Sequence, residues 1–177
     1  MSRSPVVRGF ALAMALGAPL GTALGTAACR TPNPHEELEV RDVETYWAID
    51  PSASGTQYMA PVLRFKLHNR RHHTQGSIQA TATFKRKGEE ALTWGSDWRQ
   101  ITTSRKPLAP DGDVLVELKA DARYYSTGTP ESMFQHELFK DASVEAFLRV
   151  GSSGWVSLVK ADIDRRVGSK SVQDFVK

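Results

Sequence analysis

The chain has 177 residues, of which 40% are hydrophobic and 24% charged, with a formal net charge of +3 at pH 7. This length allows one domain with a buried core and short appended segments. Residues 1–28 contain Arg3 and Arg8 and no acidic residue, so 3 − 2 leaves a net charge of about +1 for the remainder. This balance excludes the concentrated basic face of a nucleic-acid-binding domain, and no nucleic-acid partner is expected.

Residues 1–28 are predicted to be an export signal peptide. They start with the two arginines, continue through the apolar run FALAMALGAPLGTAL, and end in the small residues GTAA. A permanent membrane span is the competing interpretation. It is disfavoured because a span needs roughly 20 strongly apolar residues, whereas this run is rich in Ala and Gly and contains Pro19.

Cys29 is the only cysteine of the chain and directly follows this leader. It has no partner for an intramolecular disulfide, and the prolines beside it argue against a buried core position. The stretch TAAC resembles the lipobox of bacterial lipoproteins, although Thr26 stands where that family usually has Leu. The resemblance implies that Cys29 is lipidated and becomes the new N-terminus. The alternative is ordinary signal cleavage after Ala28, which leaves an unmodified thiol.

Residues 29–36 are predicted to be a tether, because CRTPNPHE is polar and contains two prolines. By the sorting habit of lipoproteins, Arg30 after the cysteine favours the outer membrane. We therefore expect the protein in the cell envelope, on the periplasmic side of the outer membrane if lipidated and otherwise free in the periplasm.

Residues 37–177 are predicted to form a β-sandwich domain. Apolar and polar residues alternate in most of the chain after Glu37, which is typical of strands with one buried and one solvated face. The alternating runs are LEVRDVETYWAI, APVLRFKLHN, SIQATATFKRK, GDVLVELKA, ASVEAFLRV and WVSLVKADI. Turn-forming stretches separate them: RRHHTQG, RKGEE, PLAPDGD and GSSG. The expected fold is mainly β, an immunoglobulin-like antiparallel sandwich of six to seven strands.

One short helix is expected within TGTPESMFQHELFKD. Thr129 can serve as its N-cap and Pro130 as its first residue. Phe134 and Leu138 would then share one face, which we expect to cover one end of the sandwich.

The layout resembles small immunoglobulin-like modules of bacterial envelope proteins, including the FxLyD type. In that type one strand ends in Asn and the next in an aromatic residue, and an L-x-P-G turn leads into a third strand. The corresponding residues here are Asn69, Phe84 and the turn Leu108–Gly112, which has Asp111 inserted. Such modules are mostly binding or structural parts, so the resemblance implies a fold and no particular activity.

Catalytic, cofactor and metal motifs are not found in the sequence, and we expect neither an enzyme nor a cofactor nor a metal site. The cluster HNRRHH contains His68, His72 and His73, but two arginines in the same turn would repel a cation, so an exposed basic turn is favoured. PDGD lacks the ligand pattern of a calcium loop and is interpreted as a turn. A hydrolase with a triad assembled from distant residues stays open, with His136 as its candidate base.

Aromatic and arginine residues provide the candidate ligand-binding site. Rings offer a large contact area at low entropy cost, and arginines beside them can stack or bind an acidic group. The candidate residues are Trp94, Trp98, Arg99, Arg123, Tyr124 and Tyr125. The alternative for each ring is a place in the core or at its rim.

Two functions follow from these features. The first is a lipid-anchored, non-enzymatic module that binds or scaffolds in the bacterial cell envelope, with the membrane and an envelope protein or polymer as its partners. The alternative is a soluble periplasmic domain that binds glycan or peptide through an aromatic edge patch.

Overall fold

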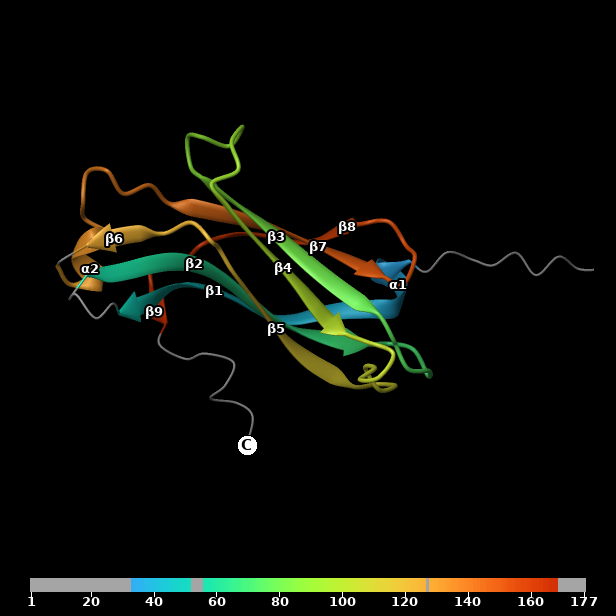
Figure 1. The fold of residues 1–177 in the computed structure, drawn as a ribbon. Helices are drawn as coiled ribbons and strands as arrows, with labels where there is room; N and C mark the ends of the chain where they lie inside the picture. Colours follow the sequence, from blue (N-terminus) through green and yellow to red (C-terminus); the bar gives the residue numbers. More distant parts are fainter. Residues whose placement is uncertain (1–32, 52–55, 127, 169–177) are drawn as a thin grey trace, which may run out of the picture. The chain divides into compact units, whose positions relative to one another are not determined.

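The computed structural model describes residues 33–51, 56–126 and 128–168. The strong alternation seen in the sequence produces two stacked sheets, antiparallel except for one short pair (Figure 1). In the described residues the first sheet contains β1 (Leu38–Pro51), β2 (Gln57–Asn69), β5 (Asp113–Lys119), β6 (Tyr124–Ser126) and β9 (Val167–Gly168). The second contains β3 (Ile78–Arg86), β4 (Gly95–Thr102), β7 (Ala142–Val150) and β8 (Val156–Asp162).

The strand order is that of an immunoglobulin-like sandwich, as predicted. One sheet has the order β5-β2-β1-β9 and the other β4-β3-β7-β8, so the chain crosses between sheets after β2, β4, β6 and β8. Seven of the described strands have at least seven residues, while β6 and β9 have three and two. The short β9 pairs with β1 in parallel, unlike all the other pairs.

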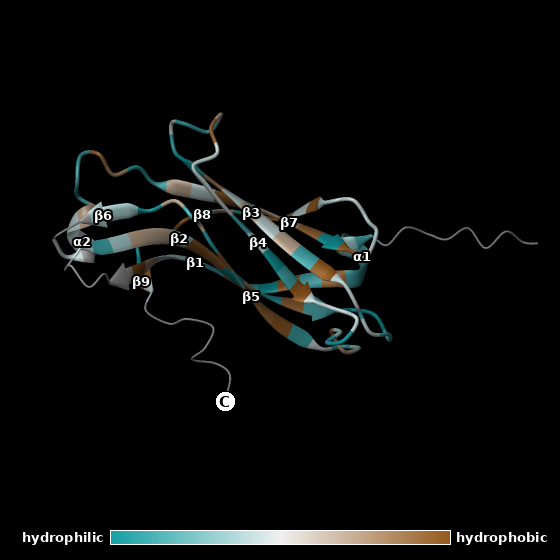
Figure 2. Ribbon diagram, in the orientation of Figure 1, coloured by the Kyte–Doolittle hydropathy of each residue, from teal (hydrophilic) through white to brown (hydrophobic). Residues whose placement is uncertain are grey.

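The core lies between the sheets and consists of the alternate residues that the sequence places on one face. On β3, for example, Ile78, Ala80, Ala82 and Phe84 are fully buried. Brown and teal segments alternate accordingly along the strands (Figure 2). Along β1 a bulge interrupts this alternation, because the register shifts between Arg41 and Glu44, where Asp42 has a φ of 51°. Val43, next to it, is consequently exposed.

The sequence pattern predicts no strand at the position of β4 (Gly95–Thr102). Only Gly95 and Thr102 of its eight residues are buried, so it lacks an apolar alternation. Its outer edge is closed by side chains: Ser96 N–H donates to Asp121 Oδ1 at 2.8 Å, and Trp98 N–H donates to Asp97 Oδ1 at 2.8 Å. Such capping blocks the addition of another strand at this edge.

The expected helix is shorter than predicted. It covers only α2 (Pro130–Met133), with Ser132 N–H donating to Thr129 Oγ1 at 3.4 Å, and the chain continues in turns. The prediction that Phe134 and Leu138 share a covering face was wrong. Phe134 packs against the core, whereas Leu138 is 71% exposed.

The two ends of the sandwich differ in what they carry (Figure 1). One end has a second helical turn, α1 (Pro34–Glu37), whose first three residues belong to the segment predicted to be a tether. The loop after β2 joins it there, because Arg70 N–H donates to the Glu37 carbonyl at 2.9 Å. The other end has β6, α2 and the hairpin between β3 and β4. The described part of the chain has no helix long and apolar enough to cross a membrane.

Candidate functional site

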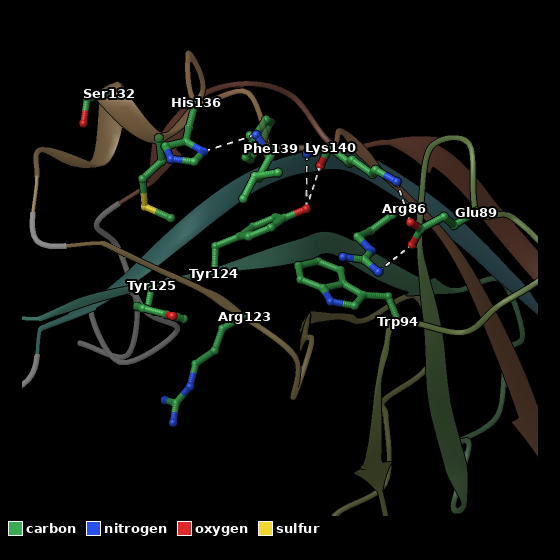
Figure 3. Close-up of a pocket in the computed structure, with 12 residues that line it drawn as sticks. Arg86, Glu89, Trp94, Arg123, Tyr124, Tyr125, Ser132, His136, Phe139 and Lys140 are labelled. Carbon is green, nitrogen blue, oxygen red and sulfur yellow. Dashed lines mark hydrogen bonds and ion pairs between the residues drawn. The ribbon is translucent and has the colours of Figure 1, made fainter.

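A pocket of about 760 Å³ lies at the end of the sandwich that carries β6 and α2 (Figure 3). Residues of the β3–β4 hairpin, of β6 and of the α2–β7 segment form its walls. They are Arg86, Glu89, Trp94, Arg123, Tyr124, Tyr125, Ser132, Met133, His136, Leu138, Phe139 and Lys140. A volume of this size suits a small ligand or a short piece of a polymer.

The inner wall of this pocket belongs to an aromatic cluster centred on Trp47. Trp47 is fully buried, and its ring lies 5.8 Å from Tyr124 and 5.2 Å from Phe139. Tyr124 in turn lies 4.9 Å from Trp94. Tilted ring pairs at these distances add stabilisation to the area they bury, so the wall is a firm surface.

Tyr124 also connects β6 to the segment that leads into β7. Its hydroxyl accepts a hydrogen bond from Lys140 N–H at 3.2 Å and donates one to the Lys140 carbonyl at 3.3 Å. These bonds hold the backbone of Lys140 against the pocket wall, as Figure 3 shows.

A carboxylate between two cations forms one side of the rim. Glu89 lies 2.5 Å from Lys140 Nζ and 2.5 Å from an Arg86 nitrogen. The Lys140 ammonium, with a smaller contribution from Arg86, holds the pKa of Glu89 below its ordinary value. The Arg86 guanidinium also lies 5.8 Å from the centre of the Trp94 ring. Both acceptor oxygens of the carboxylate are therefore already engaged.

Arg123 and Tyr125 form the other side. Tyr125 is 75% exposed and is paired with Tyr58 in the β2–β6 register. The Arg123 guanidinium stacks 4.1 Å from the centre of the Tyr58 ring and has no carboxylate partner among the described residues. In Figure 3, Arg123 and Tyr125 lie on the opposite side of β6 from Tyr124, so the pocket wraps around the outer edge of that strand.

His136 is oriented by its own turn. Its Nδ1 accepts a hydrogen bond from Leu138 N–H at 3.1 Å, so Nε2 carries the proton of the neutral ring. The hydroxyl of Ser132 donates to the Thr129 carbonyl instead. In the part of the chain that the structure describes, His136 has no hydrogen bond to a serine or a carboxylate of the kind that a triad requires.

Four of the six candidate residues from the sequence come together here: Trp94, Arg123, Tyr124 and Tyr125. Trp98 and Arg99 lie on β4 outside the pocket. Trp98 is 54% exposed, and Arg99 is paired with Asp97 at 3.0 Å. Sequence reasoning did not identify Arg86, Glu89, Phe139 and Lys140 as members of the site, because no local motif connects them.

The basic turn after β2 lies at the opposite end of the sandwich. Arg70 pairs with Glu39 at 3.4 Å and Arg71 with Glu37 at 3.6 Å, so acidic neighbours partly neutralise it. His68 pairs with Asp113 at 3.0 Å. Within residues 33–51, 56–126 and 128–168, no group of three or more His, Cys, Asp or Glu side chains is placed to hold a metal ion.

The predicted PDGD turn is held by a buried side chain. Asn69 is fully buried, and its amide donates to the carbonyls of Ala109 and His73, both at 2.9 Å. Its oxygen accepts a hydrogen bond from Arg71 N–H at 3.0 Å. Asn69 therefore ties the loop after β2 to the loop before β5.

The lipidation candidate Cys29 and the rest of residues 1–32 lie outside the described residues. Comparisons of the chain with models of known protein families and with curated protein sequences find no match. The site is therefore interpreted from its own geometry.

Proposed function

We propose that this protein is a non-enzymatic binding module of the bacterial cell envelope, attached to a membrane by lipid on Cys29. The observation that carries the binding role is the pocket at the β6 end, where a firm aromatic wall meets cationic side chains. Pockets with mostly apolar walls and a few polar groups are the usual sites of ligand binding. The periplasmic side of the outer membrane remains the proposed location.

The lengths of the chain segments support this arrangement. Three residues separate Cys29 from Asn33, which makes four Cα–Cα steps and a reach of at most about 14 Å. A lipid on Cys29 would hold the α1 end of the sandwich near the bilayer. The 13 residues of β2 span roughly 40 Å towards the other end. The pocket would therefore lie away from the membrane, within reach of soluble or polymeric partners.

The soluble alternative uses the same pocket and differs only in that Cys29 carries no lipid. For either form, the capped edge of β4 argues against recognition of a peptide by strand addition at that edge. The pocket is the better candidate for the contact with a glycan or peptide.

Metabolic labelling with palmitate in a Gram-negative host tests the attachment. We expect label on the wild-type protein, recovery in the outer-membrane fraction, and loss of both in Cys29→Ser. Arg105→Gln is the matched control, because this exposed residue should leave labelling unchanged. An unlabelled, soluble wild-type protein whose mature N-terminus is Cys29 would overturn the anchor and support the periplasmic alternative.

A further inference from the structure

We infer that the pocket at the β6 end binds an acidic oligosaccharide, with sugar rings against its aromatic faces and a carboxylate on Arg123. This inference deepens the proposed binding function and rests on it. Three properties of the pocket lead to this class of ligand: the balance of charge, the excess of hydrogen-bond donors, and the way the pocket wraps around β6.

The charged side chains of the wall are predominantly positive. Arg86, Arg123 and Lys140 face one carboxylate, that of Glu89. Glu89 is shared between Arg86 and Lys140, so it compensates only part of their charge. Arg123 has no acidic partner in the described residues and is exposed at the rim. An anionic group on the ligand would complete this arrangement, since guanidinium binds carboxylate through paired hydrogen bonds.

Apart from the hydroxyls of Ser132 and Tyr125, which can both donate and accept, the polar side chains of the pocket offer donors rather than free acceptors. The Nε2–H of His136 and the nitrogens of Arg123 are donors, whereas the Glu89 carboxylate is already engaged. The hydroxyl groups of a neutral sugar need acceptors as well as donors. A ligand rich in acceptor oxygens, such as a carboxylated sugar, fits this imbalance better.

The aromatic surfaces lie on both sides of β6. Tyr125 is exposed and stands opposite Tyr58 on one side, while Trp94 and Tyr124 line the other. Sugar rings present apolar C–H faces that pack on aromatic rings. Surfaces on two sides of one strand suit a ligand of several linked rings better than a single sugar.

An acidic peptide is the principal competitor. A peptide carries backbone N–H groups that need acceptors, which it would obtain from the edge of a strand. The outer edge of β6 offers only three residues, Tyr124–Ser126, so it provides little of this pairing. The saccharide is therefore the ligand class that the observations favour.

Titration calorimetry on the full-length mature protein in detergent tests the inference. Trigalacturonate is the probe, maltotriose is the neutral saccharide of equal length, and triglutamate is the acidic peptide. We expect trigalacturonate to bind at least about tenfold more tightly than either, a difference of roughly 1.4 kcal/mol. Its affinity should fall as salt is raised, because the contact with Arg123 is exposed.

Single substitutions test whether trigalacturonate binds in the pocket at the β6 end. Arg123→Gln and Tyr125→Ala should each weaken trigalacturonate binding about tenfold, and both residues are exposed, so the fold should persist. Trp98→Ala is the matched aromatic control outside the pocket, and Arg105→Gln is the matched charge control at the other end. Both should bind as the wild type does.

The inference is overturned if trigalacturonate fails to bind, if maltotriose or triglutamate binds equally well, or if Arg123→Gln has no effect. Failure of the proposed function is distinguishable from these results. Tight binding of maltotriose or triglutamate that Tyr125→Ala weakens would retain the binding module while excluding the acidic saccharide. Absence of palmitate label concerns the anchor alone.

Discussion

The hydroxyl of Tyr124 forms two hydrogen bonds with the backbone of Lys140, 16 residues further along the chain. Through these bonds, a three-residue strand of the first sheet positions the segment that carries one cation of the pocket. The same ring packs on Trp47 and Trp94. One side chain thus serves both the aromatic wall and the polar rim.

Tyr124→Phe should preserve the ring contacts and remove both hydrogen bonds. We expect the free energy of unfolding to fall by about 0.5–1.5 kcal/mol, because the backbone groups of Lys140 lose their partner. Urea denaturation followed by tryptophan fluorescence measures this change. Tyr125→Phe alters an exposed ring and should stay within about 0.5 kcal/mol of the wild type. Equal losses of stability in Tyr124→Phe and Tyr125→Phe would show that the hydrogen bonds of Tyr124 to Lys140 do not stabilise the fold.

Asn69→Asp should be among the more damaging substitutions at the α1 end. The variant keeps the shape but replaces Nδ2, which donates both hydrogen bonds, with a carboxylate oxygen that faces the carbonyls of His73 and Ala109. We expect a loss of about 2–4 kcal/mol in the free energy of unfolding, since the side chain at position 69 is fully buried. His73→Ala is the control, because only the backbone of His73 takes part. If Asn69→Asp unfolds at the same denaturant concentration as the wild type, the hydrogen bonds of Asn69 do not stabilise the fold.

Gly168→Ala tests the close approach between β9 and β1. A Cβ at position 168 would lie 2.3 Å from Cδ2 of Tyr46, which is 4% exposed. Overpacking of this kind costs about 1–3 kcal/mol, and we expect a lower denaturation midpoint. Gly154→Ala is the matched control, as a Cβ there meets nothing within 4 Å. A midpoint unchanged in both variants would mean that β9 can separate from Tyr46 at no cost.

Stability should decline in alkaline solution because of Tyr46. Burial, together with the hydrogen bond of 2.9 Å to Glu117, raises the pKa of Tyr46 above its ordinary value of 10.0. The folded state therefore retains a proton that the unfolded state releases. The stabilising contribution is complete below pH 10 and is lost as the pH rises towards the folded-state pKa, by at most about 1.4 kcal/mol per pH unit.

Denaturation of the wild type and of Tyr46→Phe between pH 9 and about 11.5 isolates this contribution. The variant has no phenol at position 46, so its stability should decline less steeply above pH 10 than that of the wild type. The comparison uses the two slopes, because Tyr46→Phe also loses the bond to Glu117. Parallel slopes would show that Tyr46 titrates alike in both states.

Much of the fold was predictable because burial alternates locally along a strand. The runs around Phe65, Phe84 and Leu148 indicate their buried faces without knowledge of any partner strand. Strand β4 and the extent of α2 were not predictable in this way. β4 is an edge strand with little burial, and Phe134 and Phe139 leave helical spacing to pack around Trp47.

The sequence by itself determined a β-sandwich, predicted an export-type leader before it, and identified four side chains of the pocket by their chemistry. Only the tertiary structure decided which residues share that pocket. Glu89 and Lys140 are 51 positions apart and meet because the β3–β4 hairpin and the α2–β7 segment converge at one end. Trp98 and Trp94 are near neighbours in sequence, yet the geometry of β4 leaves only Trp94 in the pocket. The alternation of apolar and polar residues is set within one strand and is therefore visible in the local sequence. A binding pocket depends on how strands distant in sequence pack together.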